Sequence, residues 1–225
     1  MSSTNAILME QGLDISHFFD LPQMSVTVSQ WAIKNYRRGE RIYFKNDHAD
    51  KIFLIKEGRV KVGVYGGDEK VITKAVYSKN DFFGFISLFD NAPRQDFATA
   101  LSSCTIYAIS NVNMQEIMRR NHKVNSLFIE LMGKRLMNME QRLQSLLFDT
   151  ARTRVVNYLR DLAQSKGIRV GYEILIRDFL PHQEIGNLTC TSRQTVSTIM
   201  SELRRKNIIY VNRKQVLVRD MEKLV

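Results

Sequence analysis

The sequence predicts an α+β fold built from three successive parts: a sandwich or small barrel of short strands, a long helix, and a helix-turn-helix followed by a hairpin. Three observations predict this order. Short β-rich runs separated by turn residues fill residues 33–109, a helical repeat with one glycine follows from 113 to 147, and residues 149–225 combine short helices with β-like segments. We therefore expect domains at 1–112, 113–148 and 149–225.

The first part contains four clear strand candidates, at residues 41–45, 51–56, 59–65 and 71–77. Between the last two, Gly66-Gly67-Asp68 predicts a tight hairpin turn, because glycine reaches positive φ without steric cost. Short strands at regular spacing with turns between them are typical of a sandwich or small barrel.

The second part has apolar residues in steps of four or three. They are Phe128, Met132, Leu136, Met139, Leu143 and Leu146. A repeat near 3.5 residues indicates a coiled-coil seam, and the basic residues Lys134, Arg135 and Arg142 lie off it. A helix packed only on its own domain is the alternative. A repeat held over about three heptads favours self-association, so we expect a homodimer.

The third part begins with a helical period over 153–162 that ends near Gly167. A β-like segment follows at 172–176. The chain ends in a hairpin candidate, with runs 208–211 and 216–219 joined by a polar turn.

Composition excludes several classes of protein. At 44% apolar and 25% charged residues, the 225-residue chain fits a soluble globular protein. No apolar run approaches the roughly 18–20 residues of a membrane helix, and the N-terminus lacks the basic start and apolar stretch of a secretory signal. Cys104 and Cys190 are too few for a disulfide framework or a four-thiolate metal site. We expect a cytoplasmic protein with no membrane partner.

The charge distribution points to a polyanion. The formal net charge is +10, and residues 149–225 alone hold 14 basic and 8 acidic side chains. A basic excess at one end is typical of nucleic-acid binding, although a solvated basic face is the alternative explanation.

Residues 182–199 have the spacing of a helix-turn-helix. Ile185 followed by Gly186 places a small residue where two helices cross closely. The second helix has an apolar inner face of Val196, Ile199, Met200 and Leu203. Thr191 and Gln194 have the form of a capping box, which predicts that this helix begins at Thr191. Cys190 stands where such turns often hold glycine, so the backbone there must accept a side chain.

The outer face of the second helix carries donors and acceptors suited to base edges in a major groove. We expect base reading by Arg193, Gln194, Ser197 and Thr198. We expect contacts to the DNA backbone from His182, Gln183, Thr191, Ser192, Arg213 and Lys214. The expected main partner is therefore double-stranded DNA.

With these motifs in place, residues 20–220 resemble the cyclic-AMP receptor protein and fumarate–nitrate regulator (CRP/FNR) family of bacterial transcription factors. The resemblance rests on Gly39-x-x-Ile42, Ile52-x-x-Ile55-x-x-Gly58-x-Val60-x-Val62, Phe83-Gly84, Ser87-Leu88-Phe89 and Gln183-Glu184-Ile185-Gly186…Thr191-Ser192-Arg193-Gln194-Thr195-Val196. It implies a cupin-like β-roll with the cyclic-nucleotide-binding-domain fold, a dimerisation helix and a C-terminal winged helix-turn-helix. It also implies a homodimer and RNA polymerase as a partner.

The family's cyclic-nucleotide cassette is altered in this chain. Phe85 replaces the carboxylate that holds the ribose, Gln95 stands at the arginine position and Asp96 at the hydroxyl position. A carboxylate there would repel phosphate, although Arg94 is one residue away. Met139 and Glu140 replace the hydroxyls that reach the purine. We expect no dependence on cyclic AMP, and either no effector or an apolar one. The candidate effector pocket comprises Phe85, Ile86, Arg94, Gln95, Asp96 and Met139.

Other cofactors and catalysis are not expected. Residues 1–40 hold no cysteine cluster for an iron–sulfur centre, and His17, His48, His122 and His182 form no recognisable haem-ligand pair. His48 stands alone in the β-rich region, so a cupin-type metal site is absent from the sequence pattern. No nucleophile and base stand in a recognisable arrangement. The sequence predicts a DNA-binding transcriptional regulator and not an enzyme. The alternative is a sensory module that regulates a protein partner.

Overall fold

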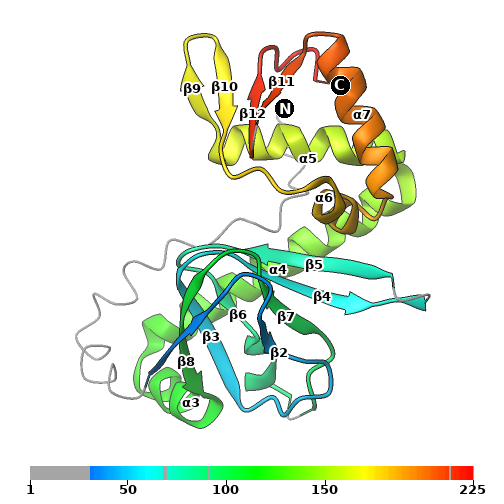
Figure 1. Cartoon of the computed structure of the whole chain (residues 1–225). Helices are drawn as coiled ribbons and strands as arrows, with labels where there is room; N and C mark the ends of the chain where they lie inside the picture. Colours follow the sequence, from blue (N-terminus) through cyan, green and yellow to red (C-terminus); the bar gives the residue numbers. More distant parts are fainter. Residues whose placement is uncertain (1–30, 68–69, 91, 213, 225) are drawn as a thin grey trace. The chain divides into compact units, whose positions relative to one another are not determined.

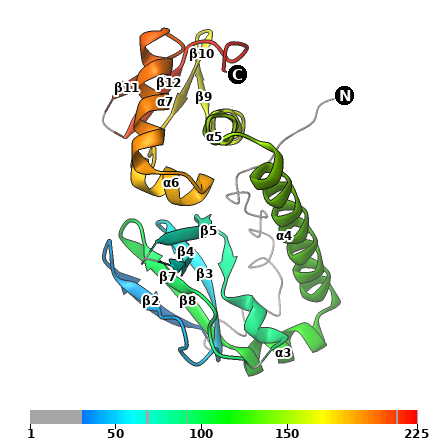
Figure 2. The same ribbon diagram turned by 90° about the vertical axis from the view of Figure 1, so that its right-hand side faces the viewer.

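A computed structural model describes residues 31–67, 70–90, 92–212 and 214–224 (Figures 1 and 2). The chain divides into two compact units, and the division falls between Arg135 and Leu136. We call them the N-terminal and C-terminal units. The division lies inside one helix, α4 (His122–Phe148), and not at either end of the helical region.

The N-terminal unit contains two four-stranded antiparallel sheets (Figure 1). The first has the order β1 (Ala32–Tyr36), β8 (Cys104–Ser110), β3 (Lys51–Glu57) and β6 (Phe82–Phe83). The second has the order β2 (Arg41–Tyr43), β7 (Phe97–Ala100), β4 (Val60–Tyr65) and β5 (Val71–Tyr77). The predicted sandwich of short strands is confirmed, and the predicted strands differ from the observed ones only at their ends.

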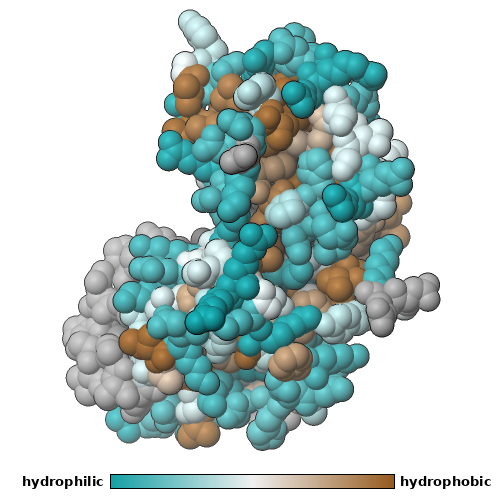
Figure 3. Space-filling model, viewed as in Figure 1, coloured by the Kyte–Doolittle hydropathy of each residue, from teal (hydrophilic) through white to brown (hydrophobic). Residues whose placement is uncertain are grey.

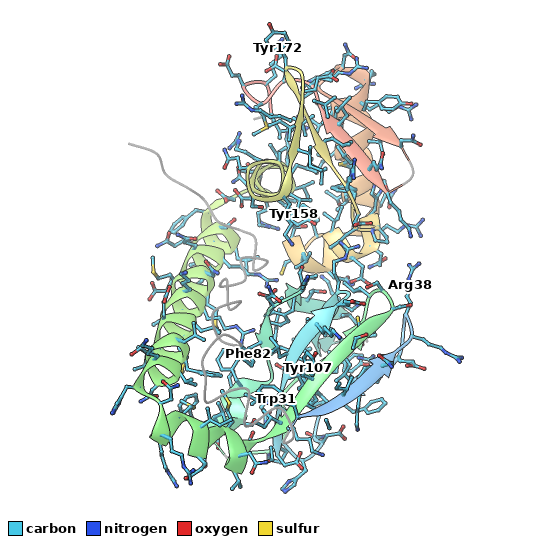
Figure 4. The ribbon with its side chains drawn as sticks, turned by 90° about the vertical axis from the view of Figure 1, so that its left-hand side faces the viewer. Trp31, Arg38, Phe82, Tyr107, Tyr158 and Tyr172 are labelled. Atoms are coloured by element: carbon cyan, nitrogen blue, oxygen red, sulfur yellow. The ribbon has the colours of Figure 1, made fainter. Side chains whose placement is uncertain are left out.

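Both faces of β3 are buried, which explains its unbroken apolar run. On one face, Phe53 stacks on Phe83 with ring centroids 5.0 Å apart, between the two sheets. On the other face, Leu54 joins a core that includes Trp31 and Phe82, whose rings lie 6.4 Å apart. Figure 4 shows Trp31, Phe82 and Tyr107 gathered at this face. Because side chains alternate across a strand, one segment supplies two cores.

The helical region after the sheets contains two helices, α3 (Asn111–Arg120) and α4, where the sequence suggested one stretch. Ser110 caps α3 by accepting the Asn113 N–H at 3.2 Å. Asn121 is extended and separates the helices, and its Oδ1 accepts the N–H of Lys123 at 3.0 Å. A side chain that satisfies free N–H groups at the start of a helix explains why α4 begins here.

The expected seam on α4 needs one correction, at Phe128. This side chain is fully buried in its own unit, where its ring lies 5.3 Å from Phe82 and 6.0 Å edge-on from Phe85. Ile129 is 67% exposed instead. The exposed apolar residues at alternating steps of three and four are Ile129, Met132, Leu136, Met139, Leu143 and Leu146. The exposed apolar repeat therefore starts at Ile129, and its role as a dimer seam stays a prediction.

The C-terminal unit places three helices beside a four-stranded sheet. They are α5 (Ala151–Lys166), α6 (His182–Thr189) and α7 (Arg193–Arg205). The sheet has the order β11 (Ile209–Asn212), β12 (Gln215–Val218), β10 (Glu173–Ile176) and β9 (Ile168–Val170). Figure 2 shows α5 end-on, next to α7 and the sheet. The predicted helix-turn-helix and following hairpin are confirmed as elements of structure.

Within the described residues, no helix combines the length and apolar character needed to cross a bilayer.

Candidate nucleic-acid interface and β-roll interior

The helix α7 is anchored by an apolar inner face. Its buried side chains are Val196, Ile199, Met200 and Leu203. The close crossing with α6 occurs at Gly186, where an added Cβ would lie 2.8 Å from the Thr191 carbonyl oxygen. Real Cβ atoms essentially never approach that closely, so only glycine fits without a shift. The expectation of a small residue at the crossing is confirmed.

The cap of α7 is Ser192, so the prediction of a capping box at Thr191 and Gln194 is wrong. Ser192 has an extended backbone, and its Oγ accepts the Thr195 N–H at 2.9 Å. The two hydroxyls also lie 2.8 Å apart. Thr191 lies one residue too early, since its own N–H donates to the Gly186 carbonyl. The Gln194 side chain is therefore not needed as a cap.

The turn between the helices runs through Cys190, which adopts a left-handed conformation with φ +52° and ψ +46°. This conformation is common in glycine and infrequent in other residues. The Cys190 N–H donates to the Gly186 carbonyl, which closes the end of α6. The other cysteine, Cys104, is buried in β8.

The expected base-reading residues lie together on the outer side of α7. Arg193, Gln194 and Thr198 are exposed, and Ser197 is half-buried. Figure 3 shows hydrophilic and near-neutral surface over this helix. The first turn holds no acidic residue, and the last turn holds Arg204 and Arg205. This face offers hydrogen-bonding groups and positive charge, the combination that suits a DNA groove.

The first residue of α6 contacts α7. The His182 Nδ1 lies 2.8 Å from the Ser197 Oγ. Burial, together with the nearby Arg193 guanidinium, lowers the pKa of His182 below its usual value. Gln183 is exposed, and its Nε2 donates to the Asn187 Oδ1 at 3.1 Å.

The two remaining residues predicted to contact the DNA backbone, Arg213 and Lys214, lie between β11 and β12. Lys214 is exposed in the turn with φ +52°, and its carbonyl accepts the Phe179 N–H at 2.8 Å. Arg213 lies outside the described residues. The hairpin follows α7 directly, which is the position of the wing in a winged helix.

Arg94 lies inside the sandwich with its guanidinium directed at main-chain oxygens. Its Nη1 donates to the Gly84 carbonyl at 2.7 Å and its Nη2 to the Lys51 carbonyl. The group stacks over the Tyr43 ring at 4.6 Å. Burial is the main cause that lowers the pKa of Arg94. Gly84, at φ +73°, leaves room for it, since an added Cβ would lie 2.9 Å from Nη1.

Asp96 is held by two groups of its own unit. Its Oδ1 accepts the Tyr43 hydroxyl at 3.1 Å, and its Oδ2 lies 2.6 Å from the Lys74 ammonium. Burial raises the pKa of Tyr43, and the Asp96 carboxylate raises it further. This arrangement presents a neutral phenol and a paired carboxylate where the sequence comparison placed the phosphate-binding hydroxyl.

The other residues of the candidate pocket do not all face the interior. Phe85 is buried in the short 3-10 helix η3 (Phe85–Leu88) and packs on α4. Ile86 is 59% exposed and Gln95 is exposed, so neither lines the sandwich interior as expected. Met139 is 56% exposed and belongs to the C-terminal unit.

The sequence did not predict a role for Arg135, whose guanidinium lies beside the rings of Phe85 and Tyr77. Its guanidinium carbon lies 4.5 Å from the Phe85 ring centroid and 4.7 Å from that of Tyr77. The Nη2 atom is buried without a hydrogen-bond partner. Burial lowers the pKa of Arg135 to about 10. The only signal in the sequence was a basic residue off the seam, which is usually solvated.

The described residues contain no group of three or more His, Cys, Asp or Glu side chains placed to hold a metal ion.

Family models match both units of the chain. The model "Cyclic nucleotide-binding domain" matches residues 33–121, and the model "Crp-like helix-turn-helix domain" matches residues 141–225. The second match supports a DNA-binding function over a module that acts only on protein partners.

Individual relatives agree with the family models. The chain is 25% identical to the "CRP-like cAMP-activated global transcriptional regulator" of Mycobacterium tuberculosis over 84% of its length and 85% of that protein. It is 26% identical to the "Global nitrogen regulator" of Synechococcus elongatus over 83% and 85%. A CooA mutant from Carboxydothermus hydrogenoformans has a similar structure, with a TM-score of 0.82, 25% identity and coverage of 96% and 95%. The first relative is a transcriptional regulator by name, the second is a nitrogen regulator and the CooA mutant shares the fold, and none of the three names describes an enzyme.

Proposed function

This chain belongs to the cyclic-AMP receptor protein and fumarate–nitrate regulator (CRP/FNR) family of transcription regulators, and on that premise we propose that it acts as a homodimer on an inverted-repeat operator. The observation that supports specific DNA binding most directly is the outer face of α7. Arg193, Gln194 and Thr198 project there from a helix whose inner face is fully buried. Such a helix can enter a major groove while its domain stays folded.

Selection of bound duplexes from a random-sequence pool tests this function. We expect an inverted repeat whose half-site centres lie about 34 Å apart, one turn of B-DNA. A selected pool without symmetry, or no enrichment over unbound DNA, would contradict the proposal. We further propose RNA polymerase as a protein partner, because activation of transcription needs a surface that contacts the polymerase.

The proposed dimer interface is the exposed stripe of α4. Leu136, Met139 and Leu143 are each more than half exposed, although they are large and apolar. Burying such a side chain contributes about 1.5–3 kcal/mol, so a stripe of this kind favours pairing with a second copy. Sedimentation at micromolar protein concentration tests it, and a monomeric wild type would contradict it.

We propose that cyclic AMP is not the effector. Arg94 donates to two main-chain carbonyls, and Asp96 already pairs with Lys74. A cyclic phosphate entering here would meet a carboxylate and would have to break the Arg94 contacts. The half-buried Arg135 lies over the Phe85 ring, and its buried Nη2 has no hydrogen-bond partner. An effector with an apolar body and a negative group therefore fits better than a purine nucleotide.

Calorimetric titration with cyclic AMP tests this exclusion. We expect no binding heat and no change in operator affinity on adding the nucleotide. A saturable site that tightens operator binding would show that Arg94 is released to take the phosphate.

A further inference from the structure

The turn between α6 and α7 is held by two arginines from other helices. The end of a helix leaves its last carbonyls without partners inside that helix. Arg142 of α4 donates from Nη2 to the Leu188 carbonyl at 2.9 Å. Arg154 of α5 donates from Nε to the Thr189 carbonyl at 2.8 Å and from Nη2 to the Cys190 carbonyl at 3.3 Å. Positive charge at this end of α6 also complements the helix dipole.

The two arginines differ in what they connect. Arg154 also donates from Nη1 to the Asp149 carbonyl at 2.8 Å, just before α5 begins, so it organises the domain that contains α7. Arg142 comes from α4, the helix that carries the exposed seam. Its Nη2 also lies 3.6 Å from the Cys190 Sγ. Arg142 therefore joins the dimerisation helix to the turn that orients α7.

We propose that Arg142 is a positioning residue that fixes the helix-turn-helix relative to α4, and so sets which spacing of two half-sites the dimer accepts. This inference rests on the proposed function as a dimer on an inverted repeat. The reading face itself does not use Arg142, because α7 is fixed on α6 by its apolar inner face and by Gly186. Loss of Arg142 should leave recognition of one half-site intact and relax the spacing of two.

The main test compares Arg142→Met and Arg142→Lys with the wild type on a series of duplexes. The series contains one half-site, the selected operator, and operators whose spacer is changed by one or two base pairs. We expect the Met variant to bind the half-site as the wild type does. Its preference for the selected spacing, measured as the ratio of its affinities for the selected and altered operators, should fall about tenfold, because a charge-assisted hydrogen bond is lost. Lysine can still donate to a carbonyl, so the Lys variant should keep part of the preference.

Lys134→Met is the matched control, since it removes one positive charge from α4. Lys134 pairs with Glu130 at 2.9 Å on the same helix. This variant should keep the spacing preference, which separates orientation from loss of net charge.

A second readout needs no DNA. In a Cys104→Ala background, the rate at which a disulfide reagent labels Cys190 reports how firmly the turn is held. Arg142→Met should raise this rate, and Arg142→Lys should raise it less.

The outcomes separate this inference from the proposed function. If the wild type binds no inverted repeat, the proposed function fails before Arg142 is at issue. If Arg142→Met weakens half-site and operator alike, or leaves spacing preference and labelling rate unchanged, the inference is overturned. A wild type that binds all spacings equally would also overturn it, because no fixed orientation would exist to lose.

Discussion

The Nδ1 atom of His182 lies 2.8 Å from the Oγ of Ser197, so the first residue of α6 contacts the second turn of α7. This contact places a titratable ring beside the proposed reading face. Burial and Arg193 hold the pKa of His182 below its usual value, which keeps the ring neutral near pH 7.

DNA phosphates favour the protonated ring, so complex formation should take up a proton that the free protein does not hold. We expect affinity for DNA to rise as the pH falls from about 8 to about 6, and to rise less in His182→Gln. His122→Gln, at an exposed histidine at the start of α4, is the control and should follow the wild type. Fluorescence anisotropy across this pH range measures it. Parallel pH curves for the wild type and His182→Gln would show that His182 does not meet the DNA backbone.

Substitution of Arg193 and substitution of Lys214 should change DNA binding in different ways. Arg193→Ala should cost about 1–3 kcal/mol on the selected operator and relax preference at one base pair, because a bidentate contact to guanine is lost. Lys214→Ala should weaken binding to all sequences alike and lower the salt slope by about one unit, as expected for one phosphate contact. Binding measured against salt concentration, with selection repeated for each variant, distinguishes them. An unchanged selected sequence for Arg193→Ala would mean that Arg193 only contacts the backbone.

The α4 seam predicts a charge-sensitive dimer. Met139→Glu would bury two like charges near the two-fold axis, and we expect dimer dissociation to increase by at least about a hundredfold. Gln144→Glu introduces the same charge at an exposed α4 position off the seam and should leave the dimer intact. Sedimentation velocity over a concentration series measures both. Equal effects of the two variants would indicate general charge repulsion and not a seam.

The cap of α7 gives a direct test of the corrected helix start. Ser192→Ala removes the acceptor for the Thr195 N–H and should lower the free energy of unfolding by about 0.5–2 kcal/mol. Thr191→Ala removes no such cap and should change the free energy of unfolding much less. Urea denaturation followed by circular dichroism compares the two variants. A larger loss of unfolding free energy in Thr191→Ala would support the capping box of Thr191 and Gln194 that the sequence predicted.

The two arginines beside the β-roll rings should also differ. Arg94→Met removes the guanidinium donors to the Gly84 and Lys51 carbonyls, of which Gly84 still accepts the Ser87 hydroxyl, and hydrogen bonds to charged groups contribute about 1.5–3 kcal/mol each. Arg135→Met removes a half-buried cation whose Nη2 is buried without a hydrogen-bond partner, so the gain from relieved desolvation offsets the lost ring contacts. We expect a clear loss of thermal stability for Arg94→Met and little change for Arg135→Met. Equal losses of thermal stability would contradict the view that the Arg135 side chain contributes little to the stability of the fold.

Local sequence signals predicted most of the elements, because short-range periodicity and turn chemistry decide them. The strand at 71–77 and the buried face of α7 follow from spacing alone. The start of α7 did not, since Thr191 and Ser192 are both good caps. Only the backbone path through Cys190 decides which one is extended.

Errors elsewhere arose from packing between distant segments. The repeat on α4 could start at Phe128 or Ile129, and contacts with Phe82 and Phe85 bury the first of them. The interior position of Arg135 likewise depends on rings at Tyr77 and Phe85, which are more than forty residues earlier in the chain. The spacing of residues along the sequence does not reveal such long-range contacts. The assignments of individual residues to bases and phosphates stay predictions.

The helix α4 has consequences for how the protein comes apart, because its first half supplies core side chains to the N-terminal unit and its second half belongs to the C-terminal unit. A protease cut between Arg135 and Leu136 would break the helical hydrogen bonds that span it and leave two segments of about 14 and 13 residues, near the lower limit for a helix standing alone. Unfolding of either unit would likewise leave the half of α4 in the other unit with a frayed end. The two units should therefore lose structure in one cooperative transition, although each has a core of its own.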